Sequence, residues 1–198
     1  MTKDQNAYQD KDHEVMIPYY ELCEMAPEYD TDKIKMKLKG FIKEDPDFLD
    51  PYLFLREIYE DEGKEKEADR LLDEAFSKAI ELITDKQGNW PDIMEWAWLE
   101  NRHIIRTILN KALSAWMNDE TDEALGLLRK LLRTNPGDNI GARDFILAIR
   151  MKMSFDEFQD RFEKDGYYDS ELIDWFENNY SKFPDEFDWW EKAVEQYH

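Results

Sequence analysis

Apolar residues between Asp50 and Ile83 follow the period of an amphipathic helix. The second half of this stretch carries one continuous apolar stripe, made of Ala68, Leu71, Leu72, Ala75, Phe76, Ala79, Ile80 and Ile83. A shorter apolar set comes before it, and Gly63 lies between the two, where a helix can end on a left-handed residue. The pattern predicts two helices that fold back on each other across a short turn.

Similar stripes recur along most of the chain. They predict helices around residues 15–26, 34–42, 104–116, 124–132, 155–162, 172–180 and 183–197. Ser154 and Glu157 have the spacing of a capping box, which marks the start of the helix after residue 154. No alternating pattern or hairpin turn competes with these helical periods. We therefore predict an all-α fold.

Two stretches lack this periodicity. Residues 1–14 are mostly charged or amide side chains, and we expect a disordered tail there. The repeat phase is also lost between residues 84 and 103, although Pro91 is suited to a helix start. We expect this insertion to lengthen the neighbouring helices rather than to add a domain. Residues 15–198 are thus predicted to form a single helical domain.

The spacing of the apolar residues resembles that of a tetratricopeptide repeat, whose period is about 34 residues. Counted from Leu49, the family's signature positions fall on Tyr52, Leu55, Tyr59, Gly63, Ala68, Leu72 and Ala75. Arg56 and Ile80 depart from the signature. The same phase fits residues 34–46 and returns after residue 105. The resemblance implies an α-α superhelix of antiparallel helix pairs, as in TPR-like proteins.

The junction from Asn135 to Arg143 is more specific. It reads Asn-Pro-x-Asp-Asn-x-Gly-x-Arg, which resembles a junction in a subset of bacterial tetratricopeptide proteins, and Glu100 to Arg102 recurs in the same subset. The resemblance implies a polar junction network of Arg102, Arg106, Asp138, Asn139 and Arg143. The network could bind a ligand or only pack helices. We favour packing, because arginine bridges helix ends through bidentate hydrogen bonds.

In tetratricopeptide proteins the first helices of successive pairs line a concave groove. The family's groove positions fall on Asp50, Leu53, Glu57, Glu60 and Asp61 in one repeat, and on Arg106, Leu109, Leu113, Trp116 and Met117 in the next. The resemblance therefore implies a non-catalytic scaffold that binds a protein or peptide. The acidic half of the groove argues against a ligand that presents a terminal carboxylate.

The charge of the chain narrows the choice of partner. The chain carries 26 basic and 47 acidic residues, a net charge of -21, which repels nucleic acid and anionic membranes and favours basic or apolar partners. A solvated acidic surface that keeps the protein soluble accounts for the same charge. Cys23 is the only cysteine, and no apolar run is long enough to span a membrane, so we expect a cytoplasmic protein.

Support for catalysis or metal binding is thin. His13, His103 and His198 are the only histidines, and none belongs to a paired metal-binding spacing. Glu100 and His103 have the E-x-x-H spacing once, without a matching pair. We expect no cofactor and no metal, and an enzyme with an unrecognised site is the least favoured interpretation.

The aromatic C-terminal segment supports the main alternative. Trp175, Phe176, Tyr180, Phe183, Phe187, Trp189, Trp190 and Tyr197 provide more apolar surface than one face of a terminal helix can hide. We expect a capping helix with Phe187 and Trp190 inward and Trp189 near the surface. Otherwise the excess forms a patch that a second copy covers, which would make the chain a self-associating structural protein, for example a homodimer.

Overall fold

The computed structural model describes residues 6–194 of the chain, and ten α-helices form almost all of the regular structure in this range. The all-α prediction is confirmed. The chain divides into two compact units, Met1–Lys111 and Ala112–His198, a division that the repeat pattern did not indicate. Each unit is described by itself below. Within residues 6–194, no helix has both the length and the apolar character needed to cross a membrane.

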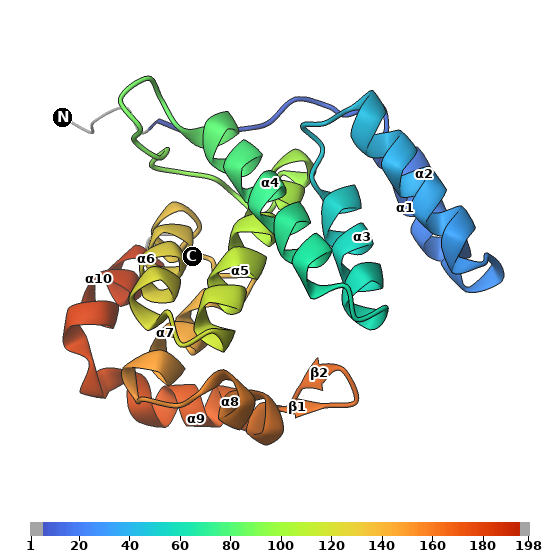
Figure 1. The fold of residues 1–198 in the computed structure, drawn as a ribbon. Helices are drawn as coiled ribbons and strands as arrows, with labels where there is room; N and C mark the ends of the chain where they lie inside the picture. The colour runs from blue at the N-terminus through green and yellow to red at the C-terminus, as the bar shows by residue number, and fades with distance from the viewer. Residues whose placement is uncertain (1–5, 195–198) are drawn as a thin grey trace. The chain divides into compact units, whose positions relative to one another are not determined.

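Unit 1, Met1–Lys111, contains four complete helices and most of a fifth. Their bounds are α1 (Met16–Met25), α2 (Thr31–Glu44), α3 (Asp50–Asp61), α4 (Glu65–Ile83) and α5 (Arg102–Met117), with short 3-10 turns at η1 (Ala26–Glu28) and η2 (Leu99–Asn101). α1 packs against α2, α2 against α3, and α3 against α4 (Figure 1). The unit boundary falls within α5.

The helix pair read from the sequence is α3 and α4. Gly63 has a left-handed φ of 70° and donates its N–H to the carbonyl of Glu60 at 2.9 Å, which ends α3. The stripe on α4 is buried at Ala68, Leu72, Ala75, Ala79 and Ile83. The two helices pack against each other along their length, so this part of the prediction is confirmed.

Residues 6–14, here called the N-terminal strap, differ from the expected disordered tail. Tyr8 donates its backbone N–H to the carbonyl of Ile93 at 2.9 Å, and Asp92 donates to the carbonyl of Asn6 at 2.8 Å. Ala7 and Ile93 form a parallel bridge. The backbone groups of these residues have no helical partners, so they pair with backbone groups of a distant segment. The periodicity of apolar residues cannot indicate such pairing. Residues 1–5 lie outside the described residues.

The same pairing explains why the insertion does not lengthen a helix. α4 ends at Ile83, as the first break in phase indicated, and α5 begins only at Arg102. Between them the N–H groups of Asp92 and Ile93 are used by the strap rather than by a helix. The expectation of a long helix that begins near Pro91 was therefore wrong.

Unit 2, Ala112–His198, holds the remaining helices. They are α6 (Thr121–Thr134), α7 (Ala142–Arg150), α8 (Phe155–Phe162), α9 (Glu171–Asn179) and α10 (Pro184–Val194), with a 3-10 turn η3 (Tyr180–Lys182). The capping box at the start of α8 is confirmed, because Ser154 and Glu157 exchange both of its hydrogen bonds. α6 packs on α7, and α7 on α9.

A small hairpin follows α8, where we expected none. Its strands are β1 (Glu163–Lys164) and β2 (Tyr167–Tyr168), antiparallel, with Glu163 opposite Tyr168. Asp165 and Gly166 both have positive φ, 54° and 81°, as the two-residue turn of a tight hairpin requires. Strands this short leave no alternating pattern in the sequence.

The core of unit 2 is rich in aromatic rings. Phe158 is fully buried, and its ring lies 5.0 Å from that of Phe162 and 5.4 Å from that of Phe145. Towards the C-terminus Phe187 is 1% exposed, and Trp190 donates its indole N–H to the carbonyl of Pro136 at 2.9 Å. Trp189 and Trp190 are half-buried. Tyr197, expected on the same stripe, lies outside the described residues.

Candidate functional site

A pocket of about 330 Å³ opens between α1, α3 and α5, within unit 1. We call it the α1/α3/α5 pocket. Its lining combines aromatic, aliphatic and charged side chains: Tyr19, Tyr20, Cys23, Asp50, Leu53, Phe54, Glu57, Arg106 and Asn110. Apolar walls with a few polar groups are the usual composition of a ligand site.

Helical spacing brings these residues together. Asp50, Leu53 or Phe54, and Glu57 are three or four positions apart on α3, so they share one face of that helix. Arg106 and Asn110 are likewise four apart on α5. Pro51 stands in the first turn of α3, where its missing N–H costs nothing, so Asp50 is held at the start of the helix.

Arg106 and Asp50 form the charged centre of the pocket. The Nε of Arg106 donates to Oδ1 of Asp50 at 2.9 Å, and its Nη2 donates to Oδ2 of the same carboxylate. Tyr20 completes the arrangement: its hydroxyl accepts from Nη2 at 2.8 Å and donates to Oδ2 of Asp50 at 3.0 Å. Such a bidentate pair is strong and geometrically defined.

The pair compensates its own charge. Burial alone would lower the pKa of Arg106, but the hydrogen bonds and negative charge of Asp50 outweigh burial, and the pKa rises. Burial, with the charge of Asp50, also raises the pKa of Tyr20. Both groups therefore keep their protons at neutral pH. The centre of the pocket is a neutral, fully hydrogen-bonded unit rather than a source of net charge.

Glu57 is different. Among residues 6–194 its carboxylate makes no hydrogen bond or ion pair, although it lines the pocket. Burial and the charge of Glu60 raise its pKa. Glu60 itself is paired with Arg56 at 2.7 Å. The Glu57 side chain is exposed at the mouth of the pocket, and the charge of Arg56 opposes the rise in its pKa only in part. The pocket thus carries one carboxylate without an ion-pair partner among the described residues.

The structure brings together only part of the expected groove. Asp50, Leu53, Glu57 and Arg106 line the pocket. Glu60 and Asp61 are exposed at the end of α3, outside the lining, and Leu109 is half-buried on α5. Leu113 and Trp116 belong to unit 2.

Trp116 is a core residue rather than a groove residue. It is 2% exposed, its ring lies 5.4 Å from that of Phe155, and its indole N–H donates to the carbonyl of Met153. The repeat numbering selects residues three or four positions apart, which share a face of α5. It gave no information on the segment after α7 that covers the end of this face.

The residues of the predicted junction network fall into different units. Arg102 and Arg106 are in unit 1, where Arg102 donates to the carbonyl of Trp96 at 3.0 Å and its guanidinium lies over the Trp96 ring. The others are in unit 2. Every one of these arginines has packing contacts in its own unit, and Arg106 also lines the α1/α3/α5 pocket.

Asp138 acts as the cap of α7. Its carboxylate accepts the N–H of Ala142 at 2.7 Å and of Arg143 at 3.0 Å. The Arg143 guanidinium lies over the rings of Phe176 and Trp190, while Asn139 is exposed. The motif from Asn135 to Arg143 is therefore explained locally, as a turn and a helix start beneath the aromatic core.

Sequence reasoning missed the contribution of α1 to the pocket. Tyr19, Tyr20 and Cys23 lie within one turn of each other on α1 and line the pocket. Nothing in that spacing indicates that α1 lies beside α3 and α5. Burial raises the pKa of the Cys23 thiol, so this thiol is a poor nucleophile.

Asp10, His13 and His103 also come together, with ligand-type atoms within 4.8 Å of one another. Their hydrogen bonds disfavour a metal ion. The N–H of Leu49 donates to Nδ1 of His103 at 3.1 Å, so the ring proton of a neutral His103 is on Nε2, which donates to Asp10 at 2.9 Å. A metal would need the lone pair of that same Nε2.

Comparison of the chain with protein-family models, with curated proteins and with solved structures finds no match. The geometry of the pocket is thus the basis for any statement of function.

Proposed function

We propose that this chain is a non-catalytic protein-binding scaffold whose α1/α3/α5 pocket holds a basic segment of a partner protein or peptide. A lysine or arginine side chain would enter with its aliphatic stem against Leu53 and Phe54. Its charged end would meet the carboxylate of Glu57. This is the arrangement by which long basic side chains bury their stems and keep a charge partner.

The observation that carries the proposal is the unpaired Glu57 in an otherwise compensated pocket. Asp50 cannot bind a ligand without losing its hydrogen bonds from Arg106 and Tyr20, so we assign the attraction for the ligand to Glu57. A cation beside Glu57 would favour the ionised carboxylate and so offset the burial and the Glu60 charge that raise its pKa. The net charge of -21 adds long-range attraction for the same kind of partner.

As part of the proposal, the helices form a short TPR-like superhelix, and the protein is cytoplasmic. Support for the repeat comes from α3 and α4, where Tyr52, Leu55, Ala68 and Leu72 are buried at the family's signature positions. Gly63, at the signature glycine position, also has the left-handed backbone conformation for which glycine is favoured. The single cysteine is in keeping with a reducing compartment.

Binding of three matched peptides tests the function. The probes are fluorescein-labelled blocked peptides of one length and one apolar framework, carrying lysine, glutamine or glutamate at the variable positions. Fluorescence anisotropy should detect binding of the lysine peptide only. Glu57→Gln should weaken that binding about tenfold, the effect of losing roughly 1.4 kcal/mol from a charge pair that the bound peptide shields from solvent.

Glu81→Gln is the matched control, because it removes the same charge from an exposed site on α4, outside the pocket. It should leave the affinity within about twofold. Equal weakening by both variants would mean that the peptide senses only the overall negative charge, and the proposed pocket would be wrong. Binding of the glutamate peptide would also contradict the proposal.

Self-association through the aromatic C-terminal segment has less support. Phe176, Phe187 and Trp190 pack on one another within unit 2, with ring centres 5.4 and 5.8 Å apart, and so leave little of their surface for a second copy. Light scattering of the eluted protein measures this alternative directly: a dimer that persists on dilution would favour it.

A further inference from the structure

The N-terminal strap is fastened at one buried polar cluster. The His13 side chain is fully buried, with Nδ1 2.7 Å from a carboxylate oxygen of Asp45 and Nε2 3.0 Å from a carboxylate oxygen of Asp10. Asp10 also accepts from His103 at 2.9 Å. We call Asp10, His13, Asp45 and His103 the His13 latch. It joins the strap to the segment after α2 and to the start of α5.

Hydrogen-bond geometry assigns the protons in the latch. Both nitrogens of His13 face carboxylates, and a carboxylate can only accept, so both nitrogens must carry protons and His13 is a cation. His103 is neutral, because its Nδ1 accepts the N–H of Leu49 and only its Nε2 donates. The two histidines of one cluster therefore hold different charges.

The electrostatics agree with this assignment. Burial alone would lower the pKa of His13, but the hydrogen bonds and charges of Asp10 and Asp45 outweigh burial, and the pKa is raised. Burial dominates at His103, whose pKa is lowered. The pKa of Asp10 is lowered because hydrogen bonds from both histidines outweigh its own burial. The charged groups facing His13 are thus the carboxylates of Asp10 and Asp45. His103, which is neutral, donates to the same Asp10 carboxylate.

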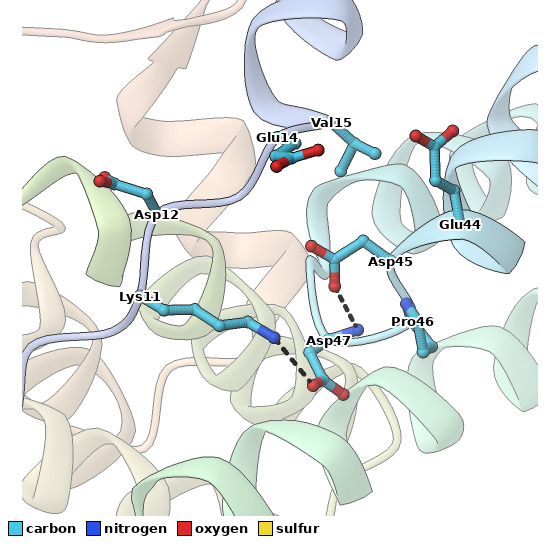
Figure 2. A pocket seen from close by; sticks show the side chains of 8 residues that line it. All are labelled: Lys11, Asp12, Glu14, Val15, Glu44, Asp45, Pro46 and Asp47. Atoms are coloured by element: carbon cyan, nitrogen blue, oxygen red, sulfur yellow. Dashed lines mark hydrogen bonds and ion pairs between the residues drawn. The ribbon is translucent and has the colours of Figure 1, made fainter.

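Water reaches the edge of the latch. A surface hollow of about 380 Å³ lies between the strap and the segment after α2, and Asp45 lines it together with Lys11 and Asp47 (Figure 2). Lys11 pairs with Asp47 across this hollow at 3.3 Å. The Asp45 side chain is 19% exposed. Protons can therefore exchange with solvent at the seam where the strap meets the rest of unit 1.

We propose that the His13 latch is a pH-operated fastening that holds the strap closed while His13 is protonated and releases it when His13 loses its proton. A neutral imidazole can donate from only one nitrogen. The other nitrogen then presents a lone pair to a carboxylate, which replaces an attraction by a repulsion. The strap's remaining ties are hydrogen bonds of Asn6 and Tyr8 to the segment around Ile93, two hydrogen bonds with Asn101, and the exposed Lys11–Asp47 ion pair. None of them involves a buried charge, so the latch is the strap's one buried ionic attachment among the described residues.

The direction of the pH effect follows from the raised pKa of His13. Its contribution is fully present below the unfolded value of about 6.5 and is lost as pH rises through the higher folded value. Each unit by which the folded pKa exceeds the unfolded one corresponds to about tenfold in the ratio of closed to open strap. The latch therefore opens as the pH rises above the unfolded histidine value, and not as the pH falls.

Amide hydrogen exchange across this pH range tests the proposal. Protection of the Tyr8 and Asp10 amides, corrected for the intrinsic pH dependence of exchange, should fall about tenfold or more as His13 deprotonates. Protection of α3 and α4 should stay constant. Nitrogen-detected NMR of the His13 ring should show both nitrogens protonated before the fall and one afterwards.

Two variants sharpen the test. His13→Gln should show the low protection of the open strap at every pH, whereas Asp12→Asn, which removes an exposed strap carboxylate outside the latch, should titrate like the natural protein. Protection that does not change with pH, or a normal profile in His13→Gln, would overturn the latch. So would one equivalent of Zn²⁺ that protects the strap at alkaline pH, because the cluster would then be a metal site.

Discussion

The strap and α10 are both close to a chain end, and each closes onto its own unit by a different means. The strap carries polar groups, and its contacts are hydrogen bonds to Asn101, Ile93 and the latch. α10 carries Phe187 and Trp190, which pack among the aromatic rings of unit 2. The comparison teaches that attachment by apolar packing leaves a periodic trace in a sequence, whereas attachment by specific hydrogen bonds leaves none.

α10 adds a charged contact to its packing. Glu186 is buried and accepts hydrogen bonds from Arg129, at 2.9 Å through Nε, and from Arg150. Burial alone would raise the pKa of Glu186, but these hydrogen bonds outweigh burial and the pKa is lowered. In α10 the polar contact accompanies aromatic packing, whereas the strap is held mainly by polar contacts, with the His13 ring 5.2 Å from that of Phe48.

The largest effect is expected from removing the aromatic anchor of α10. Phe187→Ala should destabilise unit 2 by about 3–5 kcal/mol, because the ring is fully buried and a cavity would remain. Urea unfolding followed by near-ultraviolet circular dichroism measures the change. Trp189→Ala is the control, since Trp189 is half-buried, and should cost clearly less. Equal losses would mean that α10 is not anchored through Phe187.

A smaller and more local effect is expected at the strap. Asn101 is fully buried, accepts the N–H of Asp10 at 2.9 Å and donates to the carbonyl of Tyr8 at 3.0 Å. Asn101→Ala should cost about 1–3 kcal/mol by leaving these backbone groups unpaired. Hydrogen exchange should rise in residues 6–14 and not in α4. A uniform rise throughout unit 1 would show that the strap is part of the core.

The smallest expected effect is a difference in the pH at which the strap and α10 loosen on acidification. The lowered pKa of His103 makes unit 1 lose stability as pH falls below the unfolded histidine value of about 6.5. The lowered pKa of Glu186 gives α10 a contribution that is present above about 4.5 and lost only below it. On acidification His13 stays protonated, so protonation of His103 alone should increase exchange in the strap, and it should do so at a higher pH than exchange increases in α10. The reverse order would contradict the assignment of a neutral His103.

The pocket shows how far sequence reasoning reached at the candidate site. Leu53, Glu57 and Arg106 were predicted from repeat positions, because the face of a helix follows from residue spacing alone. Tyr20 and Asn110 were not, since their place in the pocket depends on which helices pack together. Trp116 was misplaced for the same reason: it lies on the expected face of α5 but is covered by residues of α7 and α8.

By itself, the sequence determined the helical periods, the turn at Gly63, the capping box at Ser154 and the apolar faces of α3 and α4. These features depend on local sterics and on spacing within one helix. Only the tertiary structure decided the position of the strap, the Asp50 pair with Arg106, and the meeting of His13 with His103. Those contacts join residues tens of positions apart, and a hydrogen bond between single polar groups has no period that a sequence could display.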